Sequence, residues 1–85
     1  MRAFRWNALK SKRLKKIRGV SFDEIVREKL IAMREHPKRK EQRLLFFERR
    51  GYVWVVPCLE NDNETFLKTL YPSRYWTKKY KEGDL

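Results

Sequence analysis

Two apolar runs joined by a single tight turn constrain the fold more than any other part of the sequence. They are QRLLFFERR at 42–50 and YVWVVPCLE at 52–60. Both runs are rich in aromatic and β-branched residues, which are typical of strands. Arg50 and Gly51 lie at the junction and suit a tight hairpin. The sequence therefore predicts two antiparallel strands here.

Other segments extend this sheet. Residues 30–35 are compatible with a continued helix or a strand, and we favour the strand. Residues 64–71 alternate in polarity and predict a further strand, while 2–6 are compatible with a short one. Pro57 donates no ladder hydrogen bond and therefore indicates a sheet edge or a bulge. Pro72 ends the strand at 64–71.

A first helix is predicted over Ala8–Arg18. Asn7 offers a side-chain oxygen as its N-cap, and Gly19 is suited to the left-handed conformation that ends a helix. Its apolar face consists of Leu9, Leu14 and Ile17. The rest of its surface carries only cations, namely Lys10, Lys12, Arg13, Lys15, Lys16 and Arg18.

A second helix begins at the clearest start signal in the chain. Ser21 and Glu24 have the spacing of a capping box, in which each side chain accepts a hydrogen bond from the other residue's backbone. Val20 and Ile25 have the spacing of a hydrophobic staple across the same helix end. This helix is predicted over 22–29.

A short C-terminal helix is predicted over 74–83, with Ser73 as its cap. Trp76 and Tyr80 lie four residues apart and are expected to pack on the sheet. The opposite side carries the cations Arg74, Lys78 and Lys81. These cations either form a solvated face or bind phosphate, for which the planar donor fork of arginine is well suited.

The length of 85 residues predicts one domain covering 1–85. The expected fold class is α+β. Two N-terminal helices pack on one face of a small antiparallel sheet of about four strands, and the short C-terminal helix follows the sheet.

Charge and cysteine content narrow the classes of function. Lys and Arg number 22 against 11 Asp and Glu, so the net charge is +11. Such an excess is usual for proteins with a polyanionic partner. Cys58 stands alone in an apolar run and His36 is the only histidine, so neither a disulfide nor a Cys/His metal cluster is expected. An inert core thiol fits a cytoplasmic protein. No apolar run is long enough for a membrane span. No cofactor is predicted.

Three segments carry a resemblance to a known family. FRWN at 4–7 resembles F-x-W-D, IRGVSFDEIV at 17–26 resembles K-H-G-V-S-F-E-E-A, and YPSRYWTKKY at 71–80 resembles S-A-R-x-A-T-x-x-E. In this order and spacing, the chain resembles the BrnT-type toxins of bacterial toxin–antitoxin modules, which are ribonucleases related to RelE. Arg74 falls on the arginine of the last motif and Thr77 on its threonine.

Two positions depart from the family pattern. Arg18 stands where the family commonly has histidine, and Trp76 stands where it has the alanine before the threonine. The resemblance implies a RelE/BrnT-like fold and metal-independent RNA cleavage that inhibits translation. It also implies a cognate antitoxin, a ribbon-helix-helix protein, through which alone the toxin reaches DNA. The partners expected are therefore RNA, including ribosome-associated mRNA, and this antitoxin.

Residue types and resemblance together give a set of candidate site residues. The catalytic candidates are Arg74, Lys68, Tyr71 and Thr77. Arg74 is expected to stabilise the charge that develops on phosphorus. The proton carriers stay open between Lys68, Tyr71 and His36. The RNA-binding candidates are Arg43, Arg49, Lys78, Lys81, Lys12 and Lys16. The alternative is a non-catalytic module of the same fold that binds nucleic acid or protein.

Overall fold

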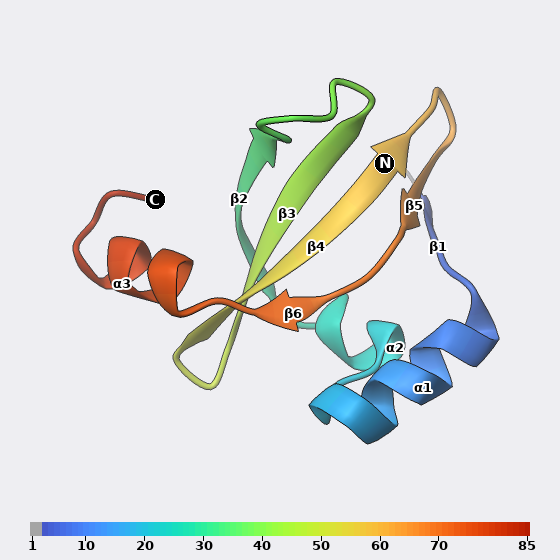
Figure 1. The fold of residues 1–85 in the computed structure, drawn as a ribbon, viewed down its shortest axis with the longest axis horizontal. Coiled ribbons are helices and arrows are strands. Elements are labelled where there is room, and N and C mark those ends of the chain that lie inside the picture. Colours follow the sequence, from blue (N-terminus) through green and yellow to red (C-terminus); the bar gives the residue numbers. More distant parts are fainter. Residues whose placement is uncertain (1–2) are drawn as a thin grey trace.

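The computed structural model describes residues 3–85 and contains one six-stranded sheet and three helices (Figure 1). The elements in chain order are β1 (Ala3–Arg5), α1 (Ala8–Arg18), α2 (Phe22–Ile25), β2 (Lys29–Glu35), β3 (Gln42–Arg49), β4 (Tyr52–Glu60), β5 (Glu64–Leu67), β6 (Tyr71–Pro72) and α3 (Arg74–Lys81). The mixed α+β class is as the sequence predicts. No helix within residues 3–85 is long and apolar enough to cross a membrane.

The sheet has the strand order β1-β5-β4-β3-β2, and β6 also pairs with β4. All pairs are antiparallel except β1 with β5, which is parallel. The predicted hairpin is confirmed, with Arg49 opposite Tyr52. Arg50 and Gly51 both have positive φ, of 53° and 79°. Two consecutive positive φ values give the turn whose twist matches that of the adjoining strands.

The central hairpin β3–β4 is buried on both faces. One face, covered by α1 and α2, contributes the buried side chains Leu45, Phe47, Trp54, Val56 and Cys58. The other face contributes Leu44, Phe46, Val53 and Val55. Trp76 and Tyr80 of α3 pack on this second face, as predicted. The two N-terminal helices therefore share one face, and α3 takes the other.

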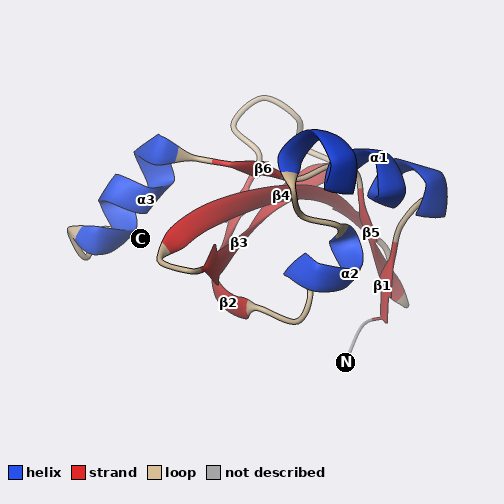
Figure 2. Cartoon of the chain, turned by 90° about the horizontal axis from the view of Figure 1, so that it is seen from below, coloured by secondary structure: helices blue, strands red, loops and turns tan. Residues whose placement is uncertain are grey.

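The helices also lie at different ends of the molecule. In Figures 1 and 2, α1 and α2 sit together at one end of the sheet and α3 sits at the opposite end. Any surface built on α3 is therefore separated from surfaces built on α1 and α2.

The prediction of about four strands is too low, in part because the expected strand at 64–71 is divided. Pairing of β5 with β4 ends at Leu67 opposite Cys58. The next pair is Lys68 with Pro57, whose carbonyl accepts a hydrogen bond from Lys68 N at 2.9 Å. The reciprocal bond is impossible because proline has no N–H. The chain leaves the ladder there and returns as β6.

Pro57 was expected at a sheet edge or a bulge, but it lies in the central strand β4. The register shift between β2 and β3 is elsewhere, between Leu30 and Ala32. The short N-terminal strand forms as β1, and residue 2, included in the prediction, lies outside the described residues. Between β5 and β6, Leu70 turns into the core and is fully buried. Its carbonyl accepts a hydrogen bond from the Arg18 guanidinium, which ties this segment to the end of α1.

The second helix is shorter than predicted, because α2 ends at Ile25 and not at residue 29. Arg27 N and Glu28 N bond to the carbonyls three residues earlier, so the chain continues as a turn. Residues from Lys29 onward pair with β3 instead. Cross-strand pairing with the aromatic strand β3 outcompetes the weak propensity of this short helix to continue.

The predicted capping box is present. Ser21 Oγ accepts a hydrogen bond from Glu24 N at 3.2 Å, and Glu24 Oε1 accepts one from Ser21 N at 3.0 Å. Lys15 Nζ of α1 lies 2.8 and 2.9 Å from the two carboxylate oxygens of Glu24. Hydrogen bonding to Lys15 and to the Ser21 backbone lowers the pKa of Glu24 to about 2. This carboxylate thus joins α1 to α2.

We predict that Glu24→Gln removes part of the acid sensitivity of the fold. A carboxyl whose pKa falls from 4.5 to about 2 on folding stabilises the fold above pH 4.5. That contribution is lost as the pH falls toward 2. Glu24→Gln should therefore unfold at a lower urea concentration than the wild type near neutral pH, and this difference in urea midpoint should shrink between about pH 5 and pH 2.

The matched control is Glu41→Gln, because Glu41 is an exposed turn residue for which no ion pair is found within residues 3–85. Its gap from wild type should stay small at every pH. A Glu24→Gln gap that is constant from neutral pH to pH 2 would contradict this role of the carboxylate.

Candidate nucleic-acid interface

A basic hollow beside α3 gathers four of the sequence-predicted residues. It has a volume of about 310 Å³ and is lined by Tyr52, Arg74, Thr77, Lys78, Lys81 and Glu82. We call it the α3 hollow. Arg74, Lys78 and Lys81 form no ion pair within residues 3–85. Their charges are therefore available to an anionic ligand.

Thr77 fastens α3 to the sheet and is buried, with 6% of its surface exposed. Its Oγ1 accepts a hydrogen bond from Val53 N at 2.8 Å and donates one to Ser73 O at 2.6 Å. Ser73 Oγ in turn accepts a hydrogen bond from Trp76 N at 3.1 Å and caps the helix. The Thr77 hydroxyl is therefore engaged in holding the helix that carries Arg74.

Aromatic packing fixes the sheet-facing side of α3. The Trp76 ring lies 4.9 Å from the Phe46 ring, centroid to centroid, and the Arg34 guanidinium lies 5.2 Å from the Trp76 centroid. The Tyr80 hydroxyl donates to Glu48 Oε1 at 3.1 Å, and this hydrogen bond raises the pKa of Tyr80. Contacts on one side of the helix thus leave the cations on its other side.

Lys68 and Tyr71 lie apart from Arg74, contrary to the expectation that Lys68 shares its site. Lys68 N donates a hydrogen bond to Pro57 O, and Ser73 N, next to Arg74 in the chain, donates one to Val53 O. The two segments therefore contact β4 at positions four residues apart. At about 3.3 Å per strand residue, this is roughly 13 Å. Tyr71 of β6 pairs with Val55 of β4 and is 38% exposed, but it does not line the α3 hollow.

Lys68 instead lines a separate hollow of about 270 Å³ beside the start of α1. Its lining residues are Asn7, Lys10, Arg13, Phe66, Leu67 and Lys68. The structure therefore divides the four catalytic candidates: Arg74 and Thr77 stay together, and Lys68 and Tyr71 do not join them.

Arg43 and Arg49, both RNA-binding candidates, are engaged with acids. Arg49 Nη1 lies 2.8 Å from Glu28 Oε2, with only 17% of its side chain exposed. Arg43 Nε lies 2.8 Å from Glu60 Oε1. Binding RNA through either guanidinium would require competition with an existing ion pair. Their positions favour a role in bracing the sheet.

His36 and Cys58 have structural surroundings. His36 Nδ1 accepts hydrogen bonds from Lys38 N at 3.0 Å and Arg39 N at 3.1 Å, and so closes the turn after β2. Cys58 is fully buried, and burial raises the pKa of its thiol to about 11. A thiol with such a pKa stays protonated and unreactive at neutral pH, as expected for a core residue.

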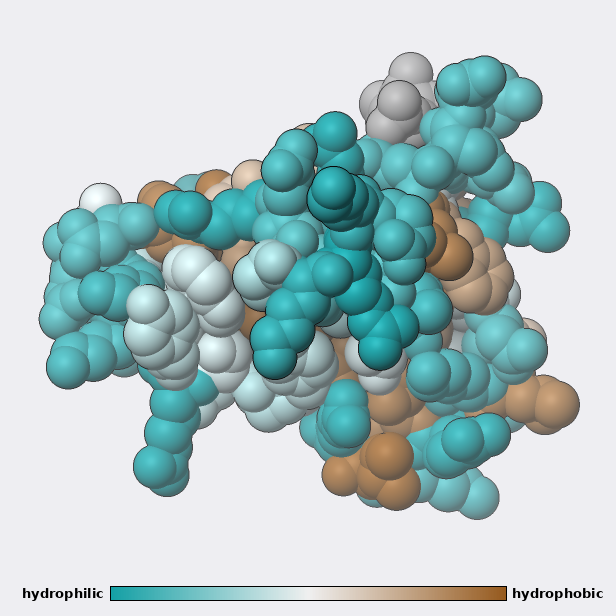
Figure 3. Space-filling model, turned by 45° about the horizontal axis from the view of Figure 1, so that its top comes forward, coloured by the Kyte–Doolittle hydropathy of each residue, from teal (hydrophilic) through white to brown (hydrophobic). Residues whose placement is uncertain are grey.

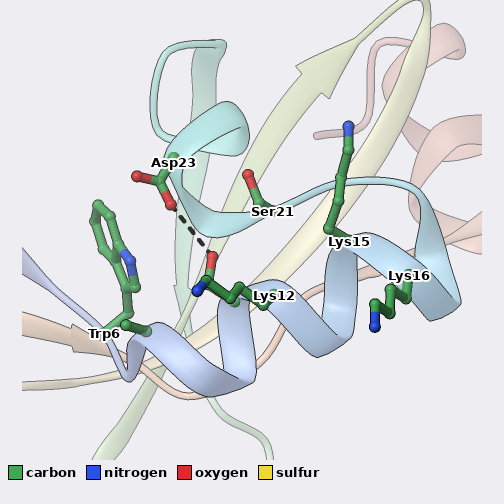
Figure 4. A pocket seen from close by; sticks show the side chains of 8 residues that line it. Trp6, Lys12, Lys15, Lys16, Ser21 and Asp23 are labelled. Atoms are coloured by element: carbon green, nitrogen blue, oxygen red, sulfur yellow. Dashed lines mark hydrogen bonds between the residues drawn. The ribbon is translucent and has the colours of Figure 1, made fainter.

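A further hollow lies between α1 and α2 and contains Lys12 and Lys16 (Figure 4). Its volume is about 520 Å³, and it is lined by Trp6, Ala8, Ser11, Lys12, Lys15, Lys16, Ser21 and Asp23. We call it the α1–α2 hollow. Lys12 and Lys16 form no ion pair with any described residue, whereas Lys15 is held by Glu24.

The outer surface agrees with the basic composition. In the view of Figure 3, hydrophilic side chains cover most of the face, and hydrophobic side chains project mainly at the lower right. Two of the most exposed apolar residues are in α1, where Leu9 is 73% and Ile17 is 64% exposed. Neither therefore packs in the core as the predicted apolar face of α1 implied, and only Leu14 of the three is buried.

Several lining residues were missed by sequence reasoning. Tyr52 and Glu82 line the α3 hollow, and Trp6, Lys15, Ser21 and Asp23 line the α1–α2 hollow. Tyr52 comes from the start of β4, and no local pattern signals that it meets α3. By contrast, the capping box predicts that Ser21 and Asp23 lie together at the start of a helix, so the sequence does indicate that these two residues are neighbours.

No group of three or more His, Cys, Asp or Glu side chains within residues 3–85 is arranged to hold a metal ion. Comparison with known proteins finds no matching family model, no matching curated protein and no matching solved structure. A function can therefore be proposed only from the chain's own residues and from the motif resemblance.

We predict that Thr77→Val destabilises the fold by about 1–3 kcal/mol, because it leaves the buried Val53 N–H without a partner. Thr77→Ser keeps the hydroxyl and should cost clearly less. Urea denaturation of both variants measures the difference. The control is Thr69→Val, at a partly buried threonine whose side chain forms no hydrogen bond with any residue of 3–85, and it should stay within about 0.5 kcal/mol of wild type. Equal losses for Thr77→Val and Thr77→Ser would refute this role of the hydroxyl.

Proposed function

We propose that the protein is a ribonuclease toxin of the BrnT kind, within the RelE-like superfamily, and that the α3 hollow binds and cleaves RNA. The observation that carries the proposal is the convergence of three cations, which have no ion-pair partner within residues 3–85, on one hollow beside a rigidly held helix. The motif resemblance supports it, since Arg74 occupies the arginine position of YPSRYWTKKY. The net charge of +11 supports a polyanionic partner.

The proposed reaction needs no redox partner. The RNA 2′-hydroxyl loses its proton and its oxygen attacks the adjacent phosphorus. The bond from phosphorus to the 5′-oxygen breaks, and that oxygen takes up a proton, leaving a 2′,3′-cyclic phosphate and a 5′-hydroxyl. Charge accumulates on the phosphoryl oxygens during the attack, and Arg74 is proposed to stabilise it with its fork of donors. Lys78 and Lys81 hold the neighbouring phosphates.

Proton transfer is assigned within the same hollow. The Tyr52 phenol and the Glu82 carboxylate are the titratable groups that share its lining with the cations. We propose that Glu82 accepts the 2′-hydroxyl proton and Tyr52 protonates the 5′-oxygen. This assignment replaces Lys68 and Tyr71, which do not line the hollow.

A cognate ribbon-helix-helix antitoxin is proposed as the protein partner, and the complex as the form that reaches DNA. The alternative function is a non-catalytic module that binds nucleic acid through the same cations. The α3 hollow favours RNA binding in both cases, and only the cleavage step separates them.

We predict that Arg74→Ala abolishes RNA cleavage and growth arrest while leaving the fold nearly intact. A preorganised charge at the transition state can contribute about 3–4 kcal/mol, which is a loss of at least 100-fold in rate. An exposed cation without an ion-pair partner contributes little to stability. Cleavage of a labelled RNA and thermal melting should be measured on the same preparations.

The matched control is Arg39→Ala, which removes an exposed arginine in the turn after β2. It should cleave like the wild type. Tyr52→Phe and Glu82→Gln should each slow cleavage and shift its pH profile. If the wild type binds RNA but does not cleave it, the non-catalytic alternative holds. If Arg74→Ala cleaves as fast as Arg39→Ala, the active site is not in the α3 hollow.

A further inference from the structure

We propose that the α1–α2 hollow binds a guanine nucleotide, with its base against Trp6 and Asp23 and its phosphate on Lys12 and Lys16. The hollow measures about 520 Å³, which is within the range of small-ligand sites. The helices α1 and α2, which supply most of its lining, lie at the end of the molecule opposite α3 (Figures 1 and 2). This hollow would therefore add a site that recognises a base to the RNA-binding site proposed at α3. The inference rests on the proposed function where the nucleotide is part of an RNA.

Trp6 supplies an aromatic surface that is already fixed in place. Its ring packs against Phe22 with a centroid distance of 6.0 Å and an interplanar angle of 36°. Trp6 is only partly buried, and its exposed part borders the hollow. Stacking of a base on an aromatic side chain is worth about 1–3 kcal/mol and does not depend on the identity of the base.

Asp23 supplies the base discrimination. Its Oδ1 accepts a hydrogen bond from Ser11 Oγ at 3.3 Å, which holds the carboxylate in position. In Figure 4 its other oxygen points toward the side of the hollow on which Trp6 lies. A carboxylate accepts at two oxygens and donates nothing. Guanine is the only common base whose Watson–Crick edge presents two adjacent donors, N1–H and the 2-amino group.

The other bases present an acceptor to the same carboxylate. Adenine and cytosine each place a ring nitrogen acceptor beside the amino group, and uracil places carbonyls on both sides of its single N–H. Each therefore leaves one carboxylate oxygen facing a lone pair. A site built to accept two hydrogen bonds rejects ligands that leave one unmade.

Lys12 and Lys16 supply the phosphate-binding charge. They lie one turn apart on α1 and have no ion-pair partner within residues 3–85. Lys15 does not serve this role, because its ammonium group contacts both oxygens of Glu24. In Figure 4, Trp6 and Asp23 lie at one end of the hollow, Lys16 lies at the other end and Lys12 lies between. A nucleotide can therefore place its base and its phosphate on groups of matching chemistry.

The first test uses the wild-type protein alone. Guanosine, adenosine, cytidine and uridine 5′-monophosphates are titrated separately while the indole N–H signal of Trp6 is followed by NMR. We expect guanosine monophosphate to bind about tenfold more tightly than the other three, as for a bidentate base contact. Pentanucleotides with one central guanine or one central adenine form the second arm, and should show the same preference.

The second test uses variants with matched charge changes. Asp23→Asn should reduce the guanine preference to nearly one while leaving adenosine monophosphate binding almost unchanged. Asp62→Asn, in the turn before β5, makes the same change outside the hollow and should keep the preference. Lys16→Gln should weaken all four nucleotides by a similar factor and lower the slope of affinity against salt. Lys38→Gln, in the turn after β2, should do neither.

The outcomes separate this proposal from the ribonuclease assignment. Tight binding of free guanosine monophosphate with weak binding of the pentanucleotides identifies a free nucleotide as the ligand, whereas the reverse identifies RNA. If the wild type binds RNA without preferring guanine, this inference fails and the ribonuclease proposal stands. If the guanine preference survives in Asp23→Asn, the carboxylate does not read the base and the inference fails.

Discussion

Pairing of β3 with β4 is the constraint on which the rest of the structure depends. The two strands bury apolar side chains on both faces, so a helix on one face alone would leave the other in water. Fully burying one large apolar side chain is worth about 1.5–3 kcal/mol, and clusters on both faces depend on this pair. A chain of +11 net charge needs such a core, because its surface charges repel one another.

Burial of both faces explains why the two proposed binding surfaces are separate. α1 and α2 cover one face, and α3 covers the other at the opposite end. Each helix uses its apolar or hydrogen-bonding side for attachment: Leu14 for α1, and Thr77 with Trp76 for α3. The cations are left on the remaining sides. Two basic hollows then arise at separate places, and the ion-paired Arg43 and Arg49 belong to neither.

The sequence was informative where structure depends on neighbouring residues. The hairpin turn at Arg50 and Gly51 and the capping box at Ser21 involve contacts within a few positions, and both are confirmed. It was less informative where the outcome depends on distant residues. The break after Leu67 depends on Pro57 being the cross-strand neighbour of the next residue, Lys68. The short α2 depends on the pairing of residues from Lys29 onward with β3. The same holds for the α3 hollow. Arg74 and Thr77 lie on one helix, so their proximity follows from the local sequence, whereas the register of the sheet places Tyr52 beside them and Lys68 in a different hollow.

RNA binding at the two hollows can be tested directly by following backbone amide chemical shifts during titration with a short guanine-containing RNA at low salt. We expect two groups of shifted amides, one at Tyr52 and residues 74–82 and one at Trp6 and residues 12–23. Amides of the turn at 36–41 should stay unchanged although it also carries cations. Shifts confined to that turn and β2, or the absence of any shift, would show that RNA does not bind at the two hollows.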